Sequence, residues 1–364
     1  MRLVSTSMLK SNMVLARSIY HNDCLILRAG QSDITRFVSQ LNNMGIEFIY
    51  VEDSKSEGIV IPDVLSEATR VSCKRILRQT IDDFSKNSTM DLTQISDAID
   101  LIISDILRNT DIQMSLNDIC AADEYTYAHS VSTTVYSLLI AKELNYSRPM
   151  LEKLAAGTLL HDMGKALLDK KVLFKASELS PEEFEYVKTH TTLGYSALQK
   201  CNNLTELSRI IALLHHERMD GSGYPGGVEA KNLHEFSRIV AIADVYDALT
   251  TDRCYRKKWS ANRAVDYLIE CSDTKFDANL VALFIQQIAI YPNGSTVKLS
   301  NNYFGIVKEQ NKSLPLRPIV RVIADELGRD IDMFEVDLVK ELSITIIESE
   351  IEINNGKSRF EIDK

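Results

Sequence analysis

The sequence predicts a mainly α protein, in which a helical domain lies between a small N-terminal α+β module and a small C-terminal β-rich module. Residues 120–292 carry almost continuous helical periodicity, and residues 1–60 alternate apolar and polar positions around turns. Short alternating runs follow the break at Pro292-Asn293-Gly294. We therefore divide the chain into an N-terminal module at 1–60, a helical connector at 61–115, the helical domain at 116–292 and the C-terminal module at 293–364.

The N-terminal module is predicted from its alternation and its turn residues. Apolar and polar positions alternate over residues 13–16 and 24–27, on either side of the turn His21-Asn22-Asp23. Helical periodicity over residues 34–44 ends at Gly45, which suits a helix C-cap, and the apolar run 46–51 predicts another strand.

The connector is predicted to begin a long helical region at Pro62, because proline suits the first turn of a helix. Four isoleucines then recur along one helical stripe, at positions 95, 99, 102 and 106. The plainer interpretation is a helix packed on the next domain. A signalling connector or a dimer seam is the alternative, but so short a stripe does not establish it.

Two further patterns place elements in the second half of the chain. Ser180 suits a helix N-cap, with Pro181 at the first helical position and Glu183 completing a capping box. Beyond residue 294, alternating runs such as 296–299, 305–308 and 344–347 predict short strands.

Composition excludes several classes of protein. An apolar share of 45% with 25% charged residues is ordinary globular composition, and the net charge of -10 argues against a polymeric nucleic-acid partner. Six cysteines without a CxxC pair suggest reduced thiols. Since neither a signal peptide nor an apolar run long enough to span a membrane is evident, we expect a cytoplasmic protein.

Histidine and aspartate residues gather in the helical domain. Five of the seven histidines fall between positions 129 and 216, and the set comprises His129, His161-Asp162, His190, His215-His216 and Asp244. Imidazole and carboxylate are donors that Zn, Mn and Fe accept, and two ligand doublets supply more donors than one tetrahedral ion uses. The set predicts two metal ions. Such centres commonly activate water for attack on phosphate esters, so we expect a metal-dependent phosphohydrolase.

The doublets carry unequal weight. A lone His161-Asp162 pair would fit a surface helix start, but Asp162 is the natural bridge between two ions. Lys165 lies one turn after His161, within reach of a phosphate, and Gly164 would remove bulk where a ligand approaches.

The remaining residues also differ in how strongly each one, taken singly, indicates a metal ligand. His215-His216 ends the apolar run 210–214, where burying two imidazoles is costly unless each finds a partner. Asp244 lies in an apolar helix, where a carboxylate is rarely unpaired. His129 and His190, taken singly, fit hydrogen-bonded core histidines equally well.

Together with Gly164-Lys165 and the segment Asp220-Gly221-Ser222-Gly223-Tyr224-Pro225, this set resembles the HD-GYP family, a branch of the HD-domain metal-dependent phosphohydrolases. The segment 244–256 extends the resemblance, which covers roughly residues 115–290. The resemblance implies an HD-type helical domain and a centre of two or, in some members, three metals, usually iron or manganese. It also implies hydrolysis of the bacterial second messenger cyclic di-GMP.

The resemblance implies roles for the matching positions. One metal would be held by His129, His161, Asp162 and Asp244, and the other by Asp162, His190, His215 and His216. A hydroxide opposite the bridging Asp162 would attack phosphorus in line with the departing 3′-oxygen. The implied catalytic residues are Asp162, Lys165 and Asp123, and the implied substrate-binding residues are Lys165, Arg253, Arg256 and Asp247. For Arg256 a solvated basic stretch is the plainer interpretation, and Asp247 also fits a position beside the ligands.

One position departs from the family pattern. Members with a third metal carry a glutamate one helical turn before the first histidine, where this chain has Tyr125. A phenol, with a pKa near 10, is a poor ligand for a hard divalent ion. We therefore expect two metals, Fe or Mn, and hydrolysis to the linear dinucleotide pGpG, with continuation to GMP as the open alternative.

Other functions fit parts of the pattern. They are a hydrolase of another nucleotide such as cyclic GMP-AMP, a catalytically silent cyclic di-GMP receptor, and a diiron oxygenase. The complete ligand set favours an enzyme over the receptor, and Lys165 and Arg253 argue against the oxygenase. For Tyr224 a scaffold role in its loop is favoured over stacking on a guanine. A homodimer and a partner protein contacting the Gly-Tyr-Pro loop stay open.

Overall fold

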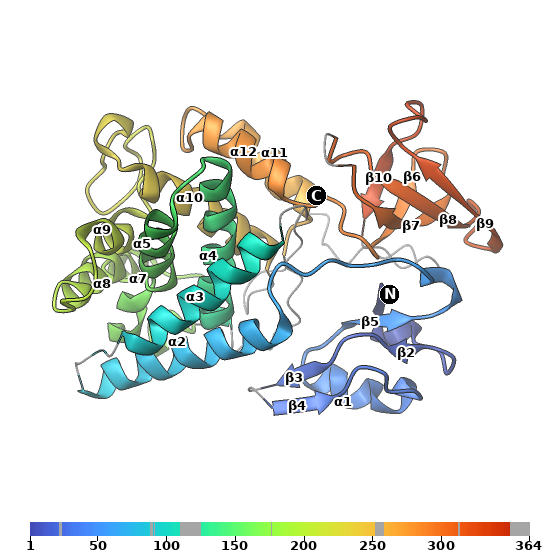
Figure 1. Ribbon diagram of the computed structural model, residues 1–364, viewed down its shortest axis with the longest axis horizontal. Helices are drawn as coiled ribbons and strands as arrows, with labels where there is room; N and C mark the ends of the chain where they lie inside the picture. The colour runs from blue at the N-terminus through green and yellow to red at the C-terminus, as the bar shows by residue number, and fades with distance from the viewer. Residues whose placement is uncertain are drawn as a thin grey trace.

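The computed structural model describes residues 1–21, 24–87, 90, 92–109, 125–175, 177–251, 258–311 and 314–349. A helical domain occupies the left of Figure 1, and the N-terminal module and the C-terminal sheet lie one below the other on the right. The predicted class is confirmed: the chain is mainly helical, with a small α+β region at its start and a β-rich region at its end.

The N-terminal module combines an antiparallel sheet of order β1-β5-β2 with a separate β3-β4 hairpin. Leu15, Ile34, Leu41 and Ile49 fill its core. The predicted strands and helix are present, and Gly45 has the positive φ, 74°, that its C-cap position requires. Its elements are β1 (Arg2–Ser5), η1 (Thr6–Met8), β2 (Val14–Leu15), β3 (Ile19–His21), β4 (Cys24–Leu27), η2 (Ile34–Phe37), α1 (Val38–Asn43), β5 (Phe48–Glu52) and η3 (Ser54–Ser56).

In the helical domain, α4 packs against α5, α10 and α12. Helices α5 and α9 approach closely at Gly157, where a Cβ atom would overlap the backbone of Ser208. The predicted capping box at Ser180 is confirmed. The elements are α2 (Glu67–Asn87), α3 (Thr93–Arg108), α4 (Tyr125–Glu143), α5 (Arg148–Leu159), η5 (Met163–Leu167), α6 (Lys170–Leu173), α7 (Pro181–Lys188), α8 (His190–Leu198), α9 (Glu206–Leu214), η6 (Ala230–Asn232), α10 (Glu235–Thr250), α11 (Ala261–Glu270) and α12 (Ala278–Gln287).

The connector helices belong to the core of the helical domain. The isoleucine stripe of α3 is buried, and α3 packs on α4 and α5 of the same chain, as the plainer interpretation predicted. The expected helix start at Pro62 is wrong. Helix α2 begins at Glu67, because Ser66 Oγ accepts a hydrogen bond from the Thr69 N–H at 3.1 Å and so caps the first turn.

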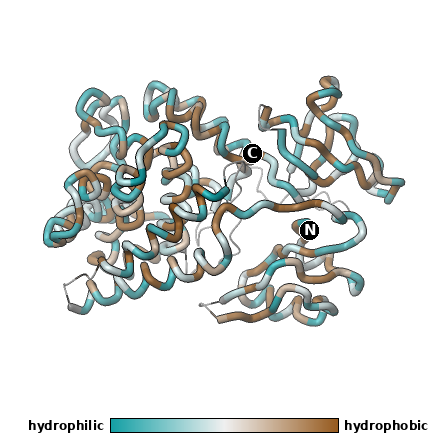
Figure 2. Tube along the Cα trace, in the orientation of Figure 1, coloured by the Kyte–Doolittle hydropathy of each residue, from teal (hydrophilic) through white to brown (hydrophobic). Residues whose placement is uncertain are grey.

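A largely apolar segment, residues 59–65, packs against both the N-terminal module and the C-terminal sheet, and it is drawn as a hydrophobic stretch in Figure 2. Ile59 packs with Ile306 and Ile323 of the C-terminal sheet, whereas Ile61 packs with Leu3 and Tyr50 of the N-terminal module. Polar contacts reinforce this junction: the Leu3 N–H donates to the Gly294 carbonyl at 3.0 Å, and Lys55 Nζ lies 2.5 Å from Asp330 Oδ1. The N-terminal module and the C-terminal sheet therefore pack directly on each other.

The C-terminal sheet is antiparallel, with the order β10-β6-β7-β8-β9. Strands lie at each of the three predicted runs. Val297, Val307 and Val320 are fully buried on the face that joins the main hydrophobic core. The strands are β6 (Thr296–Leu299), β7 (Phe304–Glu309), β8 (Ile319–Ala324), β9 (Asp330–Asp337) and β10 (Ile346–Ser349).

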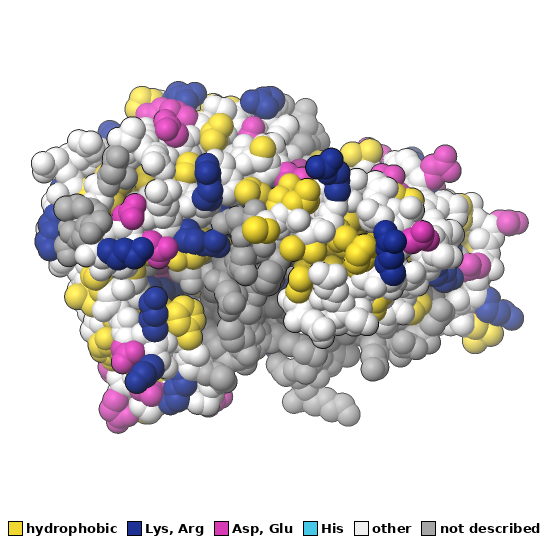
Figure 3. All heavy atoms as spheres, turned by 90° about the horizontal axis from the view of Figure 1, so that it is seen from below, with side chains coloured by type: hydrophobic (Ala, Val, Ile, Leu, Met, Phe, Trp, Pro, Cys, Tyr) yellow, Lys and Arg dark blue, Asp and Glu magenta, His cyan; other side chains and the backbone are white. Residues whose placement is uncertain are grey.

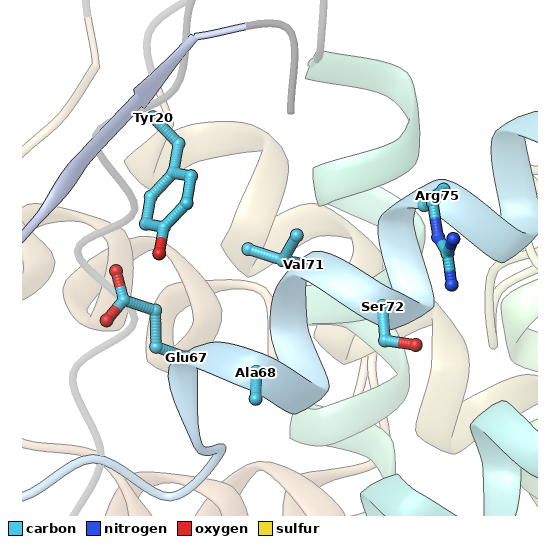
Figure 4. A pocket seen from close by; sticks show the side chains of 6 residues that line it. All are labelled: Tyr20, Glu67, Ala68, Val71, Ser72 and Arg75. Atoms are coloured by element: carbon cyan, nitrogen blue, oxygen red, sulfur yellow. The ribbon is translucent and has the colours of Figure 1, made fainter. Parts of the chain in front are cut away.

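The surface shows no single dominant feature on the side seen from below, where Lys and Arg side chains are scattered among acidic and apolar ones (Figure 3). A cleft of about 340 Å³ lies between the β3-β4 hairpin and α2, and Tyr20 and Glu67 point toward each other across it (Figure 4). Among the described helices, none is both long enough and apolar enough to cross a membrane.

Candidate metal centre

Five elements bring the seven predicted ligands to one place. His129 lies on α4, His161 and Asp162 follow the end of α5, His190 begins α8, His215 and His216 follow α9, and Asp244 lies on α10. The side chains are at most 8% exposed, except for that of His216, which is 17% exposed. The centre is therefore a buried cluster that opens at His216.

Asp162 lies between two groups of imidazoles. Its Oδ2 is 3.5 Å from His161 Nε2 and 3.9 Å from His129 Nε2. Its Oδ1 is 3.5 Å from His190 Nε2 and 3.9 Å from His215 Nε2. Because ligand atoms at about 2.1 Å from one ion lie about 3–4 Å apart, each carboxylate oxygen faces donors spaced as they would be around a metal.

The donor atoms form two compact groups, each able to hold one ion. His129, His161 and Asp162 make up the first group, and His190, His215 and His216 the second. Asp244 reaches both, since its Oδ1 is 3.0 Å from His129 Nε2 and its Oδ2 is 3.7 Å from His216 Nδ1. Each group could hold a metal ion, and the Asp162 carboxylate faces both groups.

Hydrogen bonds on the far side of the rings orient four of the histidines. The Nδ1 atoms of His161 and His190 each lie 2.7 Å from a backbone carbonyl, of Thr158 and Val187. His215 Nδ1 lies 3.0 Å from the Ile211 carbonyl, and His129 Nδ1 lies 2.6 Å from Asp247 Oδ2. Since these partners only accept, each Nδ1 carries the proton and donates. Each Nε2 then faces the centre, where its lone pair could bind a metal.

Two buried polar atoms of the centre have no hydrogen-bond partner among the described residues: His161 Nε2 and Asp162 Oδ1. Leaving a buried polar atom unpaired costs about 1–3 kcal/mol. A cation would satisfy both atoms, since one is an imidazole lone pair and the other a carboxylate oxygen. The residues present therefore fit a metal centre.

The environment holds most donors in the state that binds metal. Burial opposes the charge of Asp162, but Lys165 and His161 hold the pKa of that carboxyl well below its usual value. Burial lowers the pKa of His190 to about 4, and burial with neighbouring imidazoles lowers those of His215 and His216 well below 6.5. At neutral pH, Asp162 is therefore ionised and His190, His215 and His216 are uncharged, which are the states that bind a metal.

His129 differs from the other imidazoles. Burial would lower its pKa, but hydrogen bonds to Asp244 and Asp247 outweigh burial and raise it to about 9. The carboxylates of Asp244 and Asp247 therefore favour a positive charge at His129, in the first group of donors. A metal ion there would replace the proton on His129 Nε2, so that metal binding and proton release are coupled.

The predicted substrate contacts have different outcomes. Lys165 Nζ lies 2.5 Å from Asp162 Oδ2 and its side chain is 25% exposed, so this predicted phosphate contact lies at the edge of the centre. Asp123, Arg253 and Arg256 lie outside the described residues. Asp247, expected as a substrate contact, is buried with its carboxylate against His129, which makes it a positioning group for that ligand.

Replacing Asp247 with asparagine is expected to weaken metal binding or activity about 10–100-fold, the usual effect of losing a carboxylate that orients a ligating histidine. The amide keeps the shape but withdraws the negative charge from His129 Nδ1. Metal titration and initial rates measure the effect. Asp100→Asn is the matched control, because Asp100 is 55% exposed and pairs with the half-exposed Arg148 of α5. Equal behaviour of the two variants would contradict the positioning role.

Gly164 does not have the role predicted for it. A Cβ atom there would overlap the His190 carbonyl oxygen and come within 2.7 Å of the Gly194 nitrogen. The glycine therefore lets η5 pack against the first turn of α8, and the space it leaves is filled by protein backbone and not by a ligand.

Glu217 is a structural residue of this region that the sequence patterns did not reveal. Its fully buried carboxylate accepts hydrogen bonds from the N–H groups of Gly226 at 2.7 Å and Val228 at 2.9 Å. Gly223 packs against the Glu217 backbone, where a Cβ atom would overlap. Glu217 thus holds both sides of the Gly-Tyr-Pro loop beside His216. An acid directly after two histidines, followed by a glycine-rich loop, was the available signal.

Replacing Glu217 with glutamine is expected to lower the free energy of unfolding by about 1–3 kcal/mol, because one of the two loop N–H groups would face an amide NH₂ and stay unpaired. Thermal unfolding measures this loss. Glu229→Gln is the control within the same loop, since the Glu229 side chain is 64% exposed. Unchanged stability of Glu217→Gln would show that the loop tolerates loss of the buried carboxylate, and an equal loss in both variants would show that the effect is not specific to it.

A helical domain that gathers histidines and aspartates into two groups of possible metal ligands is typical of one class of protein, and comparison with known families identifies it. The HD domain family matches residues 114–280, and a KOW domain associated with HD domains matches residues 296–356. Residues 114–280 therefore form a domain of the HD family.

Known proteins of this kind are similar over parts of their length. The cyclic di-GMP phosphodiesterase PA4108 of Pseudomonas aeruginosa is 34% identical over 240 residues, 66% of this chain and 58% of that protein. The 3′3′-cGAMP-specific phosphodiesterase 3 of Vibrio cholerae is 32% identical over 176 residues, 48% of this chain and 38% of that protein. The chain therefore spans less than two thirds of either relative.

A solved structure, Bd1817, an HDG"Y"P protein from Bdellovibrio bacteriovorus, is also similar. The similarity covers 78% of this chain and 97% of that chain, with 18% sequence identity and a TM-score of 0.47.

Proposed function

We propose that this protein is a metal-dependent phosphodiesterase that hydrolyses cyclic di-GMP to the linear dinucleotide pGpG. The observation that carries the proposal is the position of Asp162 between two groups of buried imidazoles, with its Oδ1 and His161 Nε2 both unpaired. Names of relatives support the substrate class, since PA4108 is a cyclic di-GMP phosphodiesterase.

His129, His161, Asp162 and Asp244 would hold one ion, and Asp162, His190, His215 and His216 the other. When bound, two divalent ions such as Fe or Mn would activate a water for attack on phosphorus and neutralise charge on the phosphoryl oxygens. The chain contributes orientation: backbone carbonyls and Asp247 fix the imidazole rings, so that coordination needs little rearrangement.

Lys165 is placed to contact the phosphate. Its ammonium group is held at the mouth of the centre by Asp162 Oδ2, with part of the side chain open to solvent. A bound phosphodiester would offer this cation a second anionic partner. The positive charge would then oppose the charge that builds on the phosphoryl oxygens during attack.

Two ions, not three, are proposed. Helix α4 begins at Tyr125, one turn before His129, which is where a third metal would need a carboxylate. Without that ligand, release of pGpG before a second cleavage is the expected course, and pGpG should accumulate.

The test is to load the purified protein with Fe(II) or Mn(II), incubate it with cyclic di-GMP and, in parallel, with cyclic GMP-AMP, and identify the products by mass spectrometry. Elemental analysis should give two ions per chain. Accumulation of pGpG supports the proposal. Faster turnover of cyclic GMP-AMP would favour the specificity named for the Vibrio cholerae relative. Binding of cyclic di-GMP without turnover under either metal would instead identify a receptor.

A further inference from the structure

The metal centre opens toward the Gly-Tyr-Pro loop. Among the seven ligands and Lys165, only His216 and Lys165 have side chains more than a tenth exposed, at 17% and 25%. A substrate phosphate must therefore enter on this side. The Tyr224 ring covers His216, with ring centroids 4.7 Å apart and planes inclined by 32°, and the Tyr224 N–H donates to the His216 carbonyl at 3.3 Å.

Helix α7 places an aromatic residue and a cation against Tyr224. Phe184 lies edge-to-face with Tyr224, at 6.5 Å between centroids and 78° between planes. Lys188, one turn further along α7, holds its Nζ 4.9 Å from the Phe184 centroid and 5.4 Å from the Tyr224 centroid. Three side chains thus converge next to the opening of the centre.

The fold does not account for the exposure of Phe184. Its side chain is 47% exposed, so it contributes little to the core. The neighbouring exposed aromatic, Tyr186, has a structural task, because its hydroxyl accepts a hydrogen bond from the Asp169 N–H at 3.1 Å. An exposed aromatic ring and an adjacent cation beside a phosphate-binding centre are the groups that contact a nucleobase.

We propose that Phe184, Lys188 and Tyr224 form a platform that binds a guanine base of the substrate, placing the attached phosphate at the metal centre. The proposal rests on the proposed function and names the residues that recognise the base. Stacking on the exposed Phe184 ring suits any base, because every base has an aromatic face, and Tyr224 supports Phe184 from its edge-to-face position.

Lys188 adds selectivity for guanine. Guanine presents two acceptors side by side, O6 and N7, whereas adenine presents N7 beside an amino donor. An ammonium group can donate to both guanine atoms but is repelled by the adenine amino group. Lys188 Nζ has three donors, and its contact with Glu185 Oε1 at 2.6 Å uses one of them.

Equilibrium titration of the metal-loaded protein with GMP and AMP tests the platform, since a phosphodiesterase does not consume either monoester. We expect GMP to bind the wild type more tightly than AMP. Phe184→Ala should weaken both nucleotides about tenfold, the effect of losing one stacked base. Lys188→Ala should weaken GMP more than AMP and so remove the preference.

Matched controls are available close by. Phe174→Ala removes a phenylalanine that is 62% exposed at the end of α6, and Lys175→Ala removes a lysine that pairs with Glu183 near the start of α7. Both controls should retain wild-type GMP affinity. Unchanged GMP affinity in Phe184→Ala, or equal affinity of the wild type for GMP and AMP, overturns the platform. Failure of the wild type to hydrolyse cyclic di-GMP, with GMP preference intact, overturns only the proposed phosphodiesterase.

Discussion

Asp162→Asn is expected to abolish the proposed phosphodiesterase activity, with a loss of at least about 10³-fold, because metal ions contribute several kcal/mol to such reactions. Each oxygen of Asp162 faces a different imidazole pair, Oδ1 toward His190 and His215 and Oδ2 toward His161 and His129. An amide replaces one oxygen with an NH₂ group that cannot ligate. Whichever way the amide turns, one pair of imidazoles loses its shared ligand, so the metal content should fall below two ions per chain.

The fold should survive this replacement. Asparagine matches aspartate in size. It is also uncharged, so the variant no longer has the cost of burying a negative charge at this position. Lys165 can turn its partly exposed ammonium group to solvent. Rates, elemental analysis and thermal unfolding separate the effects, with Asp273→Asn as the control at an exposed aspartate whose φ of 62° asparagine tolerates well. Two bound ions together with substantial activity in Asp162→Asn would exclude Asp162 as a bridge.

Part of the candidate ligand set could be predicted from single residues, whereas His129, His161-Asp162 and His190 stood out only together with the rest of the set. His215-His216 at the end of an apolar run and Asp244 within one are polar residues in positions that are otherwise buried and apolar. The elements around them followed from periodicity and cap residues, as at Ser180 and Gly45. These signals are local, so a single sequence reveals them.

The roles that could not be predicted depend on contacts between distant segments. Asp247 orients His129 across 118 positions of the chain, through the packing of α10 on α4. Glu217 looks like a surface charge until the loop folds back over it and places two N–H groups on its carboxylate. Pro62 suited a helix start locally, but Ser66 caps the helix, and the buried Ile59 and Ile61 tie the preceding segment to the terminal modules. In each case tertiary packing overrode the local preference.

Gly164→Ala is expected to lower the free energy of unfolding by about 3 kcal/mol, the upper end of the usual cost of overpacking, since the new methyl group would overlap backbone and not a flexible side chain. The overlap is with the carbonyl oxygen of His190, so η5 and α8 must move apart. His190 and Asp162 lie on opposite sides of this contact. A shift of about 1 Å in a reacting group can cost about 10²-fold in rate, and we expect a loss of that size.

Thermal unfolding and steady-state rates measure both effects. Gly45→Ala is the control, because it shows the effect of replacing a glycine that lies outside the helical domain. Gly45 has a positive φ and open space where a Cβ atom would lie, so alanine there should cost about 1–2 kcal/mol of backbone strain. Gly45 lies in the N-terminal module, so the metal content and rate of that variant should match the wild type. A Gly164→Ala variant with a wild-type rate would mean that the His190 position does not depend on this contact. A reduced rate with full metal occupancy would place the damage in the geometry of the centre, because Gly164 touches no donor atom and acts only through the backbone that carries His190.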